Sequence, residues 1–190
     1  MKLVLIKHAR PEIDPTVPAK EWSLSQAGQH QSLALGKALK RELQPDALFC
    51  STESKAVETA QGIGQVLGLD AQVCQGLHEQ SRATAPFFED QRQWRQAVEA
   101  GFARPNEAIY GEESFGDAAA RFAQAIESLG IEDRCAAVVA HGTVISLFAQ
   151  RMASVDALEM WRRLTLPSWV VMEANPWRVL DVQCGPWQDA

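Results

Sequence analysis

Short apolar runs that end at polar residues divide this 190-residue chain. Residues 3–6 and 135–140 are continuous apolar runs, which predict strands buried on both faces, as in a parallel sheet. Residues 46–50 and 71–74 predict two further short strands. Near the end of the chain, the strands predicted at 168–173 and 177–181 are separated by Ala-Asn-Pro, which indicates a tight antiparallel hairpin.

Between these runs, apolar residues recur at helical spacing. The predicted helices cover residues 25–43, 56–67, 86–100, 115–129, 143–152 and 155–163. Alternating strands and helices predict an α/β fold, a three-layer α/β/α sandwich with a mostly parallel sheet and an antiparallel edge. We expect residues 1–190 to form a single domain, with an insertion at about 81–112 that covers the functional site.

Two histidines fall where predicted strands end. His8 follows the first strand and lies between the cations Lys7 and Arg10, whereas His141 follows the 135–140 strand and precedes a helix. Ligands of open α/β sheets bind beyond the carboxyl ends of the strands, and the free N–H groups of a helix N-terminus favour anions. Either histidine alone could be a hydrogen-bonded turn residue, but together with the cations they favour an anion site, with phosphate as the anion.

Lys55 would lie in the first turn of the 56–67 helix, at the same edge of the sheet. A lysine there opposes the helix dipole, so the position needs another explanation. Binding an anion is one explanation, and a solvated lysine is the other.

Composition narrows the class of protein. The net charge of −6 argues against non-specific nucleic-acid binding, which requires a basic face. No stretch approaches the ~20 apolar residues of a membrane helix, and the first apolar run is too short for a signal peptide. We therefore predict a cytoplasmic protein that binds neither nucleic acid nor membranes.

The order of the motifs resembles that of the histidine phosphatase superfamily, which has the phosphoglycerate mutase-like fold. The family's opening strand–Arg-His-Gly corresponds to residues 5–9, Leu-Ile-Lys-His-Ala, and its Leu-Ser-x-x-Gly corresponds to residues 24–28. Its Ser-x-x-x-Arg-Ala-x-x-Thr-Ala signature corresponds to residues 51–60, Ser-Thr-Glu-Ser-Lys-Ala-Val-Glu-Thr-Ala. Glu79 corresponds to the family's acidic residue, and residues 138–142, Val-Val-Ala-His-Gly, correspond to its closing strand–His-Gly.

This resemblance implies a phosphatase that acts on a soluble phosphomonoester without a cofactor. His8 would attack phosphorus and form a phosphohistidine, which water then hydrolyses, and Glu79 would protonate the leaving oxygen. The catalytic residues would be His8, Glu79 and His141. The phosphate-binding groups would be Lys7, Lys55, Arg10, Gly142 and His141. Trp22 and Arg82 are weaker candidates for lining the substrate pocket.

The chain departs from the family at both usual arginines, which are Lys7 and Lys55 here. Arginine binds two phosphate oxygens with a planar fork, whereas lysine is a point charge that can lose its proton. Arg10 could supply the missing fork. The replacements also motivate a different function, that of a catalytically weakened protein that only binds a phosphate ligand.

Two further functions have less support from the residues. A phosphoglycerate mutase-type phosphotransferase would carry a longer region between the Glu79 position and the second His-Gly. A metal site formed by His8, His141 and Glu79 lacks a ligand-spacing signature, and the neighbouring cations would repel a metal. We therefore predict no metal. A homodimer could form through the tryptophan-bearing edge hairpin.

Overall fold

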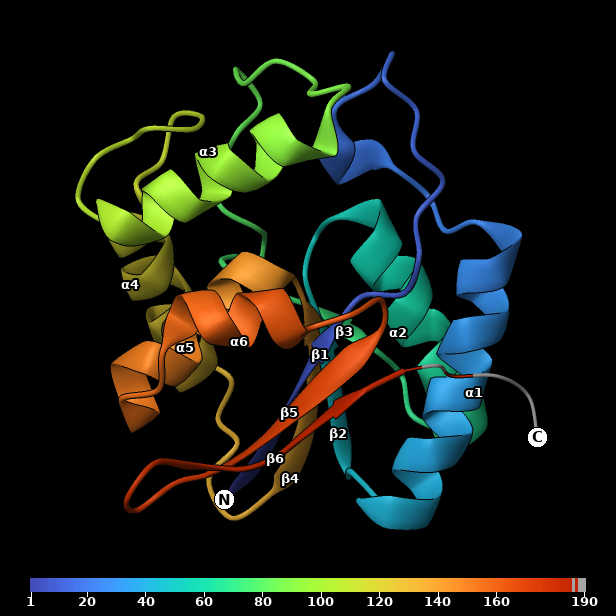
Figure 1. The fold of residues 1–190 in the computed structure, drawn as a ribbon. Coiled ribbons are helices and arrows are strands. Elements are labelled where there is room, and N and C mark those ends of the chain that lie inside the picture. Colours follow the sequence, from blue (N-terminus) through green and yellow to red (C-terminus); the bar gives the residue numbers. More distant parts are fainter. Residues whose placement is uncertain (186, 188–190) are drawn as a thin grey trace.

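A six-stranded sheet forms the centre of the molecule (Figure 1). The computed structural model describes residues 1–185 and 187, and its strands follow the order β3-β2-β4-β1-β5-β6. The strands are β1 (Lys2–Lys7), β2 (Ala47–Cys50), β3 (Gln72–Val73), β4 (Cys135–Ala140), β5 (Ser168–Glu173) and β6 (Arg178–Cys184). Strands β1 to β4 pair in parallel, and β5 pairs antiparallel with both β1 and β6. This confirms the mostly parallel sheet with an antiparallel edge.

Helices cover both faces of the sheet. They are α1 (Gln26–Glu42), α2 (Ser54–Leu67), α3 (Gln91–Ala103), α4 (Phe115–Glu127), α5 (Gly142–Ala153) and α6 (Ala157–Arg163), with a short 3-10 helix η1 (Ala19–Glu21). In Figure 1, α1 and α2 lie on one side of the sheet and α4 to α6 on the other, while α3 lies across the upper end. The three-layer α/β/α arrangement is therefore confirmed.

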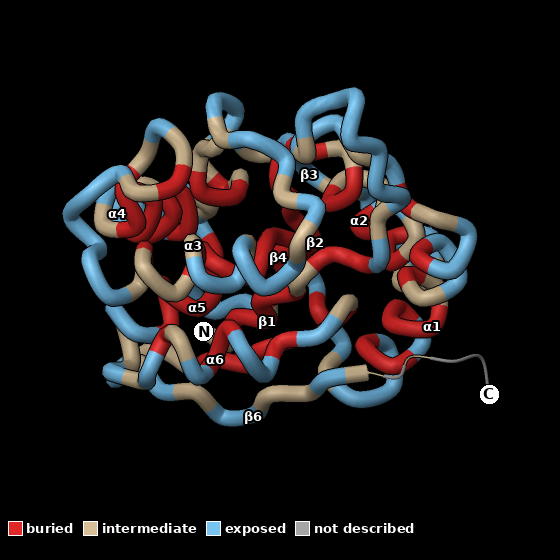
Figure 2. The backbone as a smooth tube through the Cα atoms, turned by 45° about the horizontal axis from the view of Figure 1, so that its top comes forward, coloured by how far each residue is buried: buried red, intermediate tan, exposed pale blue. Residues whose placement is uncertain are grey.

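Alternating side chains of β1 enter two separate cores. Val4 and Ile6 pack with residues of α1 and α2, such as Leu35. Leu3 and Leu5 instead belong to the cluster that includes Phe122 of α4. All four β1 side chains are fully buried, and Figure 2 shows buried backbone on both sides of the sheet. The prediction from the continuous apolar run, that this strand is buried on both faces, is therefore confirmed.

One predicted helix begins at the wrong residue. The helix expected at 86–100 is α3, which begins at Gln91 because Asp90 is its N-cap and accepts a hydrogen bond from the Arg92 N–H. The residues from Pro86 to Asp90 lie outside the helix. Apolar spacing continues across this boundary, so the capping side chain, and not the pattern, determines where the helix begins.

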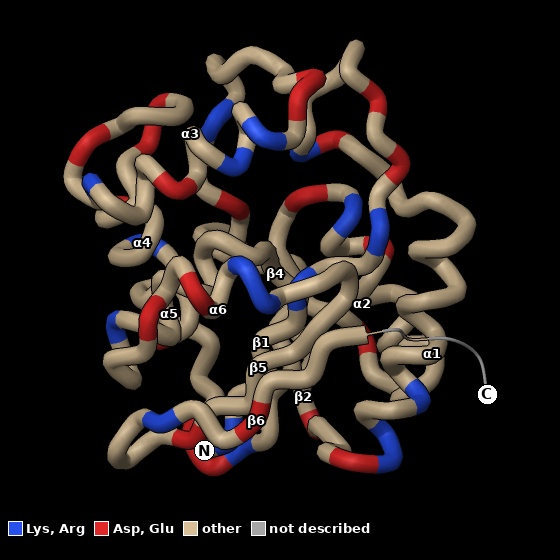
Figure 3. Tube along the Cα trace, in the orientation of Figure 1, with Lys and Arg blue, Asp and Glu red and all other residues tan. Residues whose placement is uncertain are grey.

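The topology brings three strand ends together. Lys7 is paired with Ala140, and Cys50 with Val139, so β1, β4 and β2 end side by side. Beyond the strands the ladder continues, because the His8 N–H donates to the Ala140 carbonyl and the Ser51 N–H to that of Val139. Figure 3 shows that charged residues gather on helices and loops, while the strands are largely uncharged. Within the described residues, no helix has the length and apolar character needed to cross a membrane.

Candidate active site at the strand ends

The backbone determines which ring nitrogen of His8 is free. His8 is 8% exposed, and its Nδ1 lies 2.8 Å from the carbonyl oxygen of Ala9. A carbonyl oxygen can only accept, so Nδ1 must carry the hydrogen. In the neutral ring this leaves a lone pair on Nε2. The turn therefore presents Nε2 of His8 as a nucleophile.

The turn that carries His8 is tied to α2. The Ala9 N–H donates to Oγ1 of Thr59 at 3.0 Å, and the same hydroxyl donates to the Lys55 carbonyl at 2.6 Å. Ala9 is fully buried and is not among the residues with positive φ. The alanine therefore replaces the family's glycine without backbone strain.

His141 lies beside His8, with ring centroids 5.2 Å apart. Its Nε2 is 2.8 Å from Oγ of Ser51 and 3.6 Å from a carboxylate oxygen of Glu53. Its other nitrogen, Nδ1, is buried and has no hydrogen-bond partner among the residues that the structure describes. A buried ring nitrogen without a partner is available to a ligand at the strand ends.

Burial keeps both histidines neutral near pH 7. Desolvation, followed by the charges of His141 and Lys55, holds the pKa of His8 well below its ordinary value. Desolvation also lowers the pKa of His141 to about 4, although the carboxylate of Glu53 opposes this shift. A neutral imidazole is the form that can act as a nucleophile.

Lys55 lies near the same histidines, in the first turn of α2, where its charge acts on the ring of His8. Its Nζ donates to the carbonyl of Ala19 at 2.6 Å and to Oε2 of Glu53 at 2.5 Å. The side chains of Lys55 and Glu53 are only 5% and 10% exposed. Lys55 is therefore not a solvated lysine, and its carboxylate partner offsets its unfavourable place at a helix N-terminus.

Glu53 is a site residue that the sequence patterns did not identify. Its Oε1 accepts a hydrogen bond from the backbone N–H of Glu79 at 2.8 Å, while Oε2 binds Lys55. Burial acts to raise the pKa of Glu53, but His141 and Lys55 outweigh burial and hold it well below its ordinary value. The available signal was an acidic residue two positions before Lys55 in a strand-to-helix turn.

The N-terminus of α5 does bind an anion, but that anion belongs to the protein. The Glu79 carboxylate accepts from the N–H groups of Thr143 at 3.2 Å and Val144 at 3.3 Å, and from that of Gln80 at 2.9 Å. Glu79 is 8% exposed. Gly142 begins the helix, where an added Cβ would lie 3.2 Å from Cε of Lys7. The glycine therefore leaves room for Lys7.

Lys7 has a different environment from Lys55. Its Nζ donates to the carbonyl of Leu164 at 2.7 Å. Desolvation lowers the pKa of Lys7 to about 8, opposed by the charge of Glu79. Lys7 is thus close to losing its proton at neutral to mildly alkaline pH.

The remaining predicted residues lie around this centre. Arg10 is exposed, and its carbonyl accepts from both N–H and Oγ of Ser25, at 3.0 Å each. Gly28 is required beside this carbonyl, because an added Cβ would lie 2.1 Å from it. The Arg82 guanidinium lies over the Tyr110 ring, 5.5 Å from its centroid.

Trp22 is half-buried in the loop that follows β1. Its indole N–H donates to the Asp14 carbonyl at 2.7 Å, and its ring meets that of Phe87 edge-on, with centroids 6.3 Å apart. This contact joins the loop to the 81–112 segment. The structure therefore places the Trp22 ring between two loops, and its backbone N–H donates to the Ala19 carbonyl that also accepts from Lys55.

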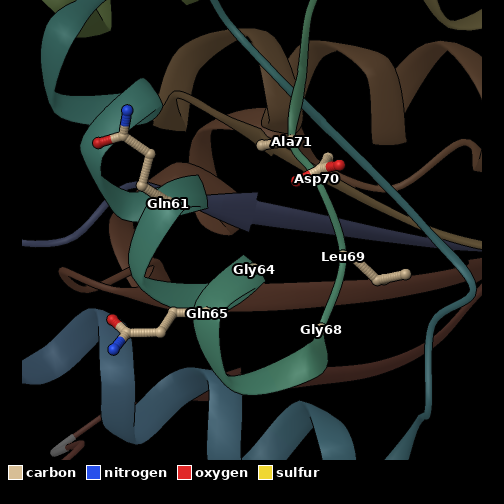
Figure 4. Close-up of a pocket in the computed structure, with 7 residues that line it drawn as sticks. All are labelled: Gln61, Gly64, Gln65, Gly68, Leu69, Asp70 and Ala71. Carbon is tan, nitrogen blue, oxygen red and sulfur yellow. The ribbon is translucent and has the colours of Figure 1, made fainter.

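A separate hollow of about 470 Å³ lies at the other end of α2 (Figure 4). It is lined by Gln61, Gly64, Gln65, Gly68, Leu69, Asp70 and Ala71. At the helical rise of about 1.5 Å per residue, the lining residues on this helix lie from about 9 Å (Gln61) to about 20 Å (Gly68) from Lys55 along its axis. It contains none of the histidines or lysines described above, so it is distinct from the strand-end site.

Comparison with known proteins agrees with this geometry. The mycobacterial glucosyl-3-phosphoglycerate phosphatase in complex with inorganic phosphate has a TM-score of 0.71 and 22% identity, with coverage of 100% of this chain and 99% of that chain. The Entamoeba histolytica phosphoserine phosphatase in complex with 3-phosphoglyceric acid has a TM-score of 0.75 and 15% identity, with 98% of each chain covered. At these identities the likeness establishes the fold.

A search of curated proteins gives no significant match. The sequence profile of the histidine phosphatase superfamily (branch 1), however, matches residues 3–183. That span contains both strand-end histidines, both lysines and the two acidic residues of the site. The chain belongs to the histidine phosphatase superfamily.

Proposed function

We propose that this protein is a phosphatase that hydrolyses a small, soluble phosphomonoester through a phosphohistidine at His8. The observation that carries this proposal is the hydrogen bond from Nδ1 of His8 to the Ala9 carbonyl, which leaves Nε2 as the nucleophilic nitrogen. The neutral ring, the neighbouring His141 and the two lysines would together bind a phosphoryl group, and their closeness at the strand ends supports this role.

The reaction has two steps. Nε2 of His8 forms a bond to phosphorus while the bond from phosphorus to the ester oxygen breaks. Glu79, which must enter this step in its protonated form, gives that oxygen its proton and becomes a carboxylate. Water then attacks the phosphohistidine, the N–P bond breaks, Glu79 takes a proton from the water, and inorganic phosphate leaves. His8 and Glu79 both return to their starting states.

The cations would hold the oxygens of the phosphoryl group, whose charge must be stabilised in the transition state. An ammonium group has three hydrogens. Lys55 gives two of them to Ala19 and Glu53, and Lys7 gives one to Leu164, so both lysines retain donors for phosphate. His141 would add Nδ1, Gly142 would contribute from the start of α5, and Arg10 would contact the phosphate from the rim.

Substrate choice would come from the loops. Residues 81–112 would cover the site, with Arg82 and Trp22 lining the path of the ester's organic part. Gln80 supports this placement, because its Nε2 lies 2.5 Å from the Tyr110 carbonyl and 2.7 Å from that of Glu113, joining both ends of the segment beside Glu79. A cytoplasmic location and a homodimer through the β5–β6 hairpin remain predictions.

A phosphate-binding protein without turnover is the second candidate. It is favoured by the partners that both lysines already have, since bonds to Ala19, Glu53 and Leu164 reduce what each ammonium can offer a transition state. It is also favoured by the loss of the arginine fork at both positions.

Hydrolysis of p-nitrophenyl phosphate from pH 5 to 8 separates these functions. We expect wild-type turnover, and a loss of at least about 10³-fold in kcat for His8→Ala because the nucleophile is removed. His30→Ala is the matched control, since His30 is exposed on α1. No turnover in the wild type, together with retained phosphate binding, would contradict the phosphatase and support the binding protein.

A further inference from the structure

Glu53 is a buried carboxylate at a site that is proposed to bind an anion, so its presence there requires an explanation. Glu53 is 9% exposed and lies at the N-cap position of α2, beside the ring of His141 and the ammonium of Lys55. Its negative charge repels a phosphate dianion. A residue that weakens phosphate binding directly must therefore contribute through the groups that it contacts.

Glu53 contacts three members of the site at once. One oxygen binds Nζ of Lys55, and the other accepts the Glu79 N–H at 2.8 Å and lies 3.6 Å from Nε2 of His141. These residues come from α2, from the segment after β3 and from the end of β4. One carboxylate thus connects the phosphate-binding cations to the backbone of the acid.

We propose that Glu53 is a positioning residue that keeps Lys55 protonated and aimed at the phosphoryl group, and that offsets the charge of His141 when phosphate binds. The proposal rests on the proposed function. An arginine at position 55 would stay charged without help, whereas a buried lysine requires an anionic neighbour. Glu53 and Lys55 together would then replace the single arginine of the family.

The electrostatics of Lys55 support this role. Desolvation lowers the pKa of Lys55, and the charge and hydrogen bond of Glu53 are the strongest opposing influences. Glu79 also opposes the shift, more weakly, whereas Arg82 adds to it. His8 faces the same ammonium and has its own pKa lowered by it. Glu53 is therefore the main group that favours the charged lysine.

The geometry of His141 extends the proposal to the second histidine. A protonated ring would donate from Nε2 to Oγ of Ser51, and Glu53 lies 3.6 Å from that nitrogen. Its buried Nδ1 would then donate to a phosphate oxygen. Burial opposes this protonation most strongly, and Lys55 and Arg82 add to that opposition, whereas Glu53 and Glu79 favour the protonated ring. The negative charge of a bound phosphate would act in the same direction as the two carboxylates.

The test is Glu53→Gln in two backgrounds, wild type and Lys55→Arg, with kcat/KM for p-nitrophenyl phosphate measured from pH 5.5 to 9.5. With Lys55 present, we expect Glu53→Gln to lower kcat/KM about 30-fold at pH 8 and to move the alkaline limb to lower pH. With Lys55→Arg, the same change should cost less than about threefold, since arginine keeps its charge.

Two further variants keep the test decisive. Glu53→Asp retains the charge and should leave the alkaline limb near its wild-type position, which tests the proposal even where Lys55→Arg does not fold. Glu58→Gln makes the same chemical change on α2, where the carboxylate holds the Leu24 N–H instead of a pocket cation. It should leave the pH profile unchanged.

Two results would overturn the proposal. One is a loss of kcat/KM for Glu53→Gln that is equal at every pH and in both backgrounds, and the other is an increase in activity. An inactive wild type would contradict the proposed function instead. The same variants would then be compared by calorimetric binding of inorganic phosphate. If Glu53→Gln weakens phosphate binding in the wild-type background but not in the Lys55→Arg background, the role of Glu53 is supported. If Glu53→Gln leaves the phosphate affinity of the wild-type background unchanged, the role is contradicted.

Discussion

The two sides of the strand-end site hold their lysines differently. On the α2 side, Lys55 forms a buried ion pair with Glu53. On the β1 side, Lys7 donates to the neutral carbonyl of Leu164, and the charge of Glu79 is the main influence that opposes its loss of a proton. Both lysines occupy positions where the family usually has arginine. The same replacement of arginine by lysine is therefore supported by a carboxylate at one position and by a carbonyl at the other.

This difference shows what a lysine needs in place of arginine. A buried lysine next to a carboxylate keeps its charge. If the lysine is removed, however, the carboxylate is left buried without a partner and lowers the stability of the protein. When Lys7 is removed, Glu79 still keeps its three backbone N–H partners, so no carboxylate loses its hydrogen-bonded cation, but the charge of Lys7 itself is less strongly supported. The α2 side should therefore govern stability, and the β1 side should govern the pH range of activity.

The largest expected effect is on the α2 side. Lys55→Met should lower the free energy of unfolding at pH 7 by about 3 kcal/mol, because Glu53 would be left buried without its partner. Lys7→Met should cost no more than about 1 kcal/mol, the value of one hydrogen bond to Leu164. Urea denaturation of both variants measures the difference.

A second replacement tests whether the unpaired carboxylate of Glu53 causes the loss of stability in Lys55→Met. Glu53→Gln in the Lys55→Met chain should recover part of the stability. If Lys55→Met and Lys7→Met lower the free energy of unfolding equally, the claim that the α2 side governs stability is wrong.

An intermediate effect is expected in the alkaline pH range. Lys7 must be protonated to hold phosphate, and its pKa is about 8, so kcat/KM should fall as the pH rises through that value. At pH 9 the value should be about tenfold below that at pH 7. Lys7→Arg should extend activity to higher pH, whereas an unchanged alkaline limb in this variant would show that Lys7 does not set it.

The smallest effect concerns the residue that joins the two sides. The Thr59 hydroxyl accepts from the Ala9 N–H and donates to the Lys55 carbonyl. Thr59→Val removes both bonds at similar volume and should lower kcat about fivefold, because the turn that orients His8 loosens. Thr59→Ser keeps the hydroxyl and should stay within about twofold of wild type. Equal losses in both variants would point to packing instead.

The fold and the strand ends could be predicted because they depend on local patterns. The run at residues 3–6 predicted β1, and the Ala-Asn-Pro turn predicted the β5–β6 hairpin. The start of α3 could not be placed from periodicity, because it depends on the capping bond of Asp90. Local sequence therefore identifies elements more reliably than their boundaries.

The site could be predicted only in part, because residues that contact one another in it are far apart in the sequence. His8, Lys55 and His141 were found because each lies next to a recognisable strand or helix end. That Glu79 binds the start of α5 could not be inferred, since 64 positions separate it from Thr143. Glu53 lies in a run of polar residues between β2 and α2, and nothing in that local pattern shows that its side chain is buried.

The most direct test of the central claim is to identify the phosphorylated residue during turnover. Wild type and His8→Ala would be quenched at alkaline pH while hydrolysing a ³²P-labelled aryl phosphate, then digested and analysed by mass spectrometry. We predict label on His8 in the wild type, and none in His8→Ala. Turnover without label on His8, or label on His141 instead, would contradict the claim.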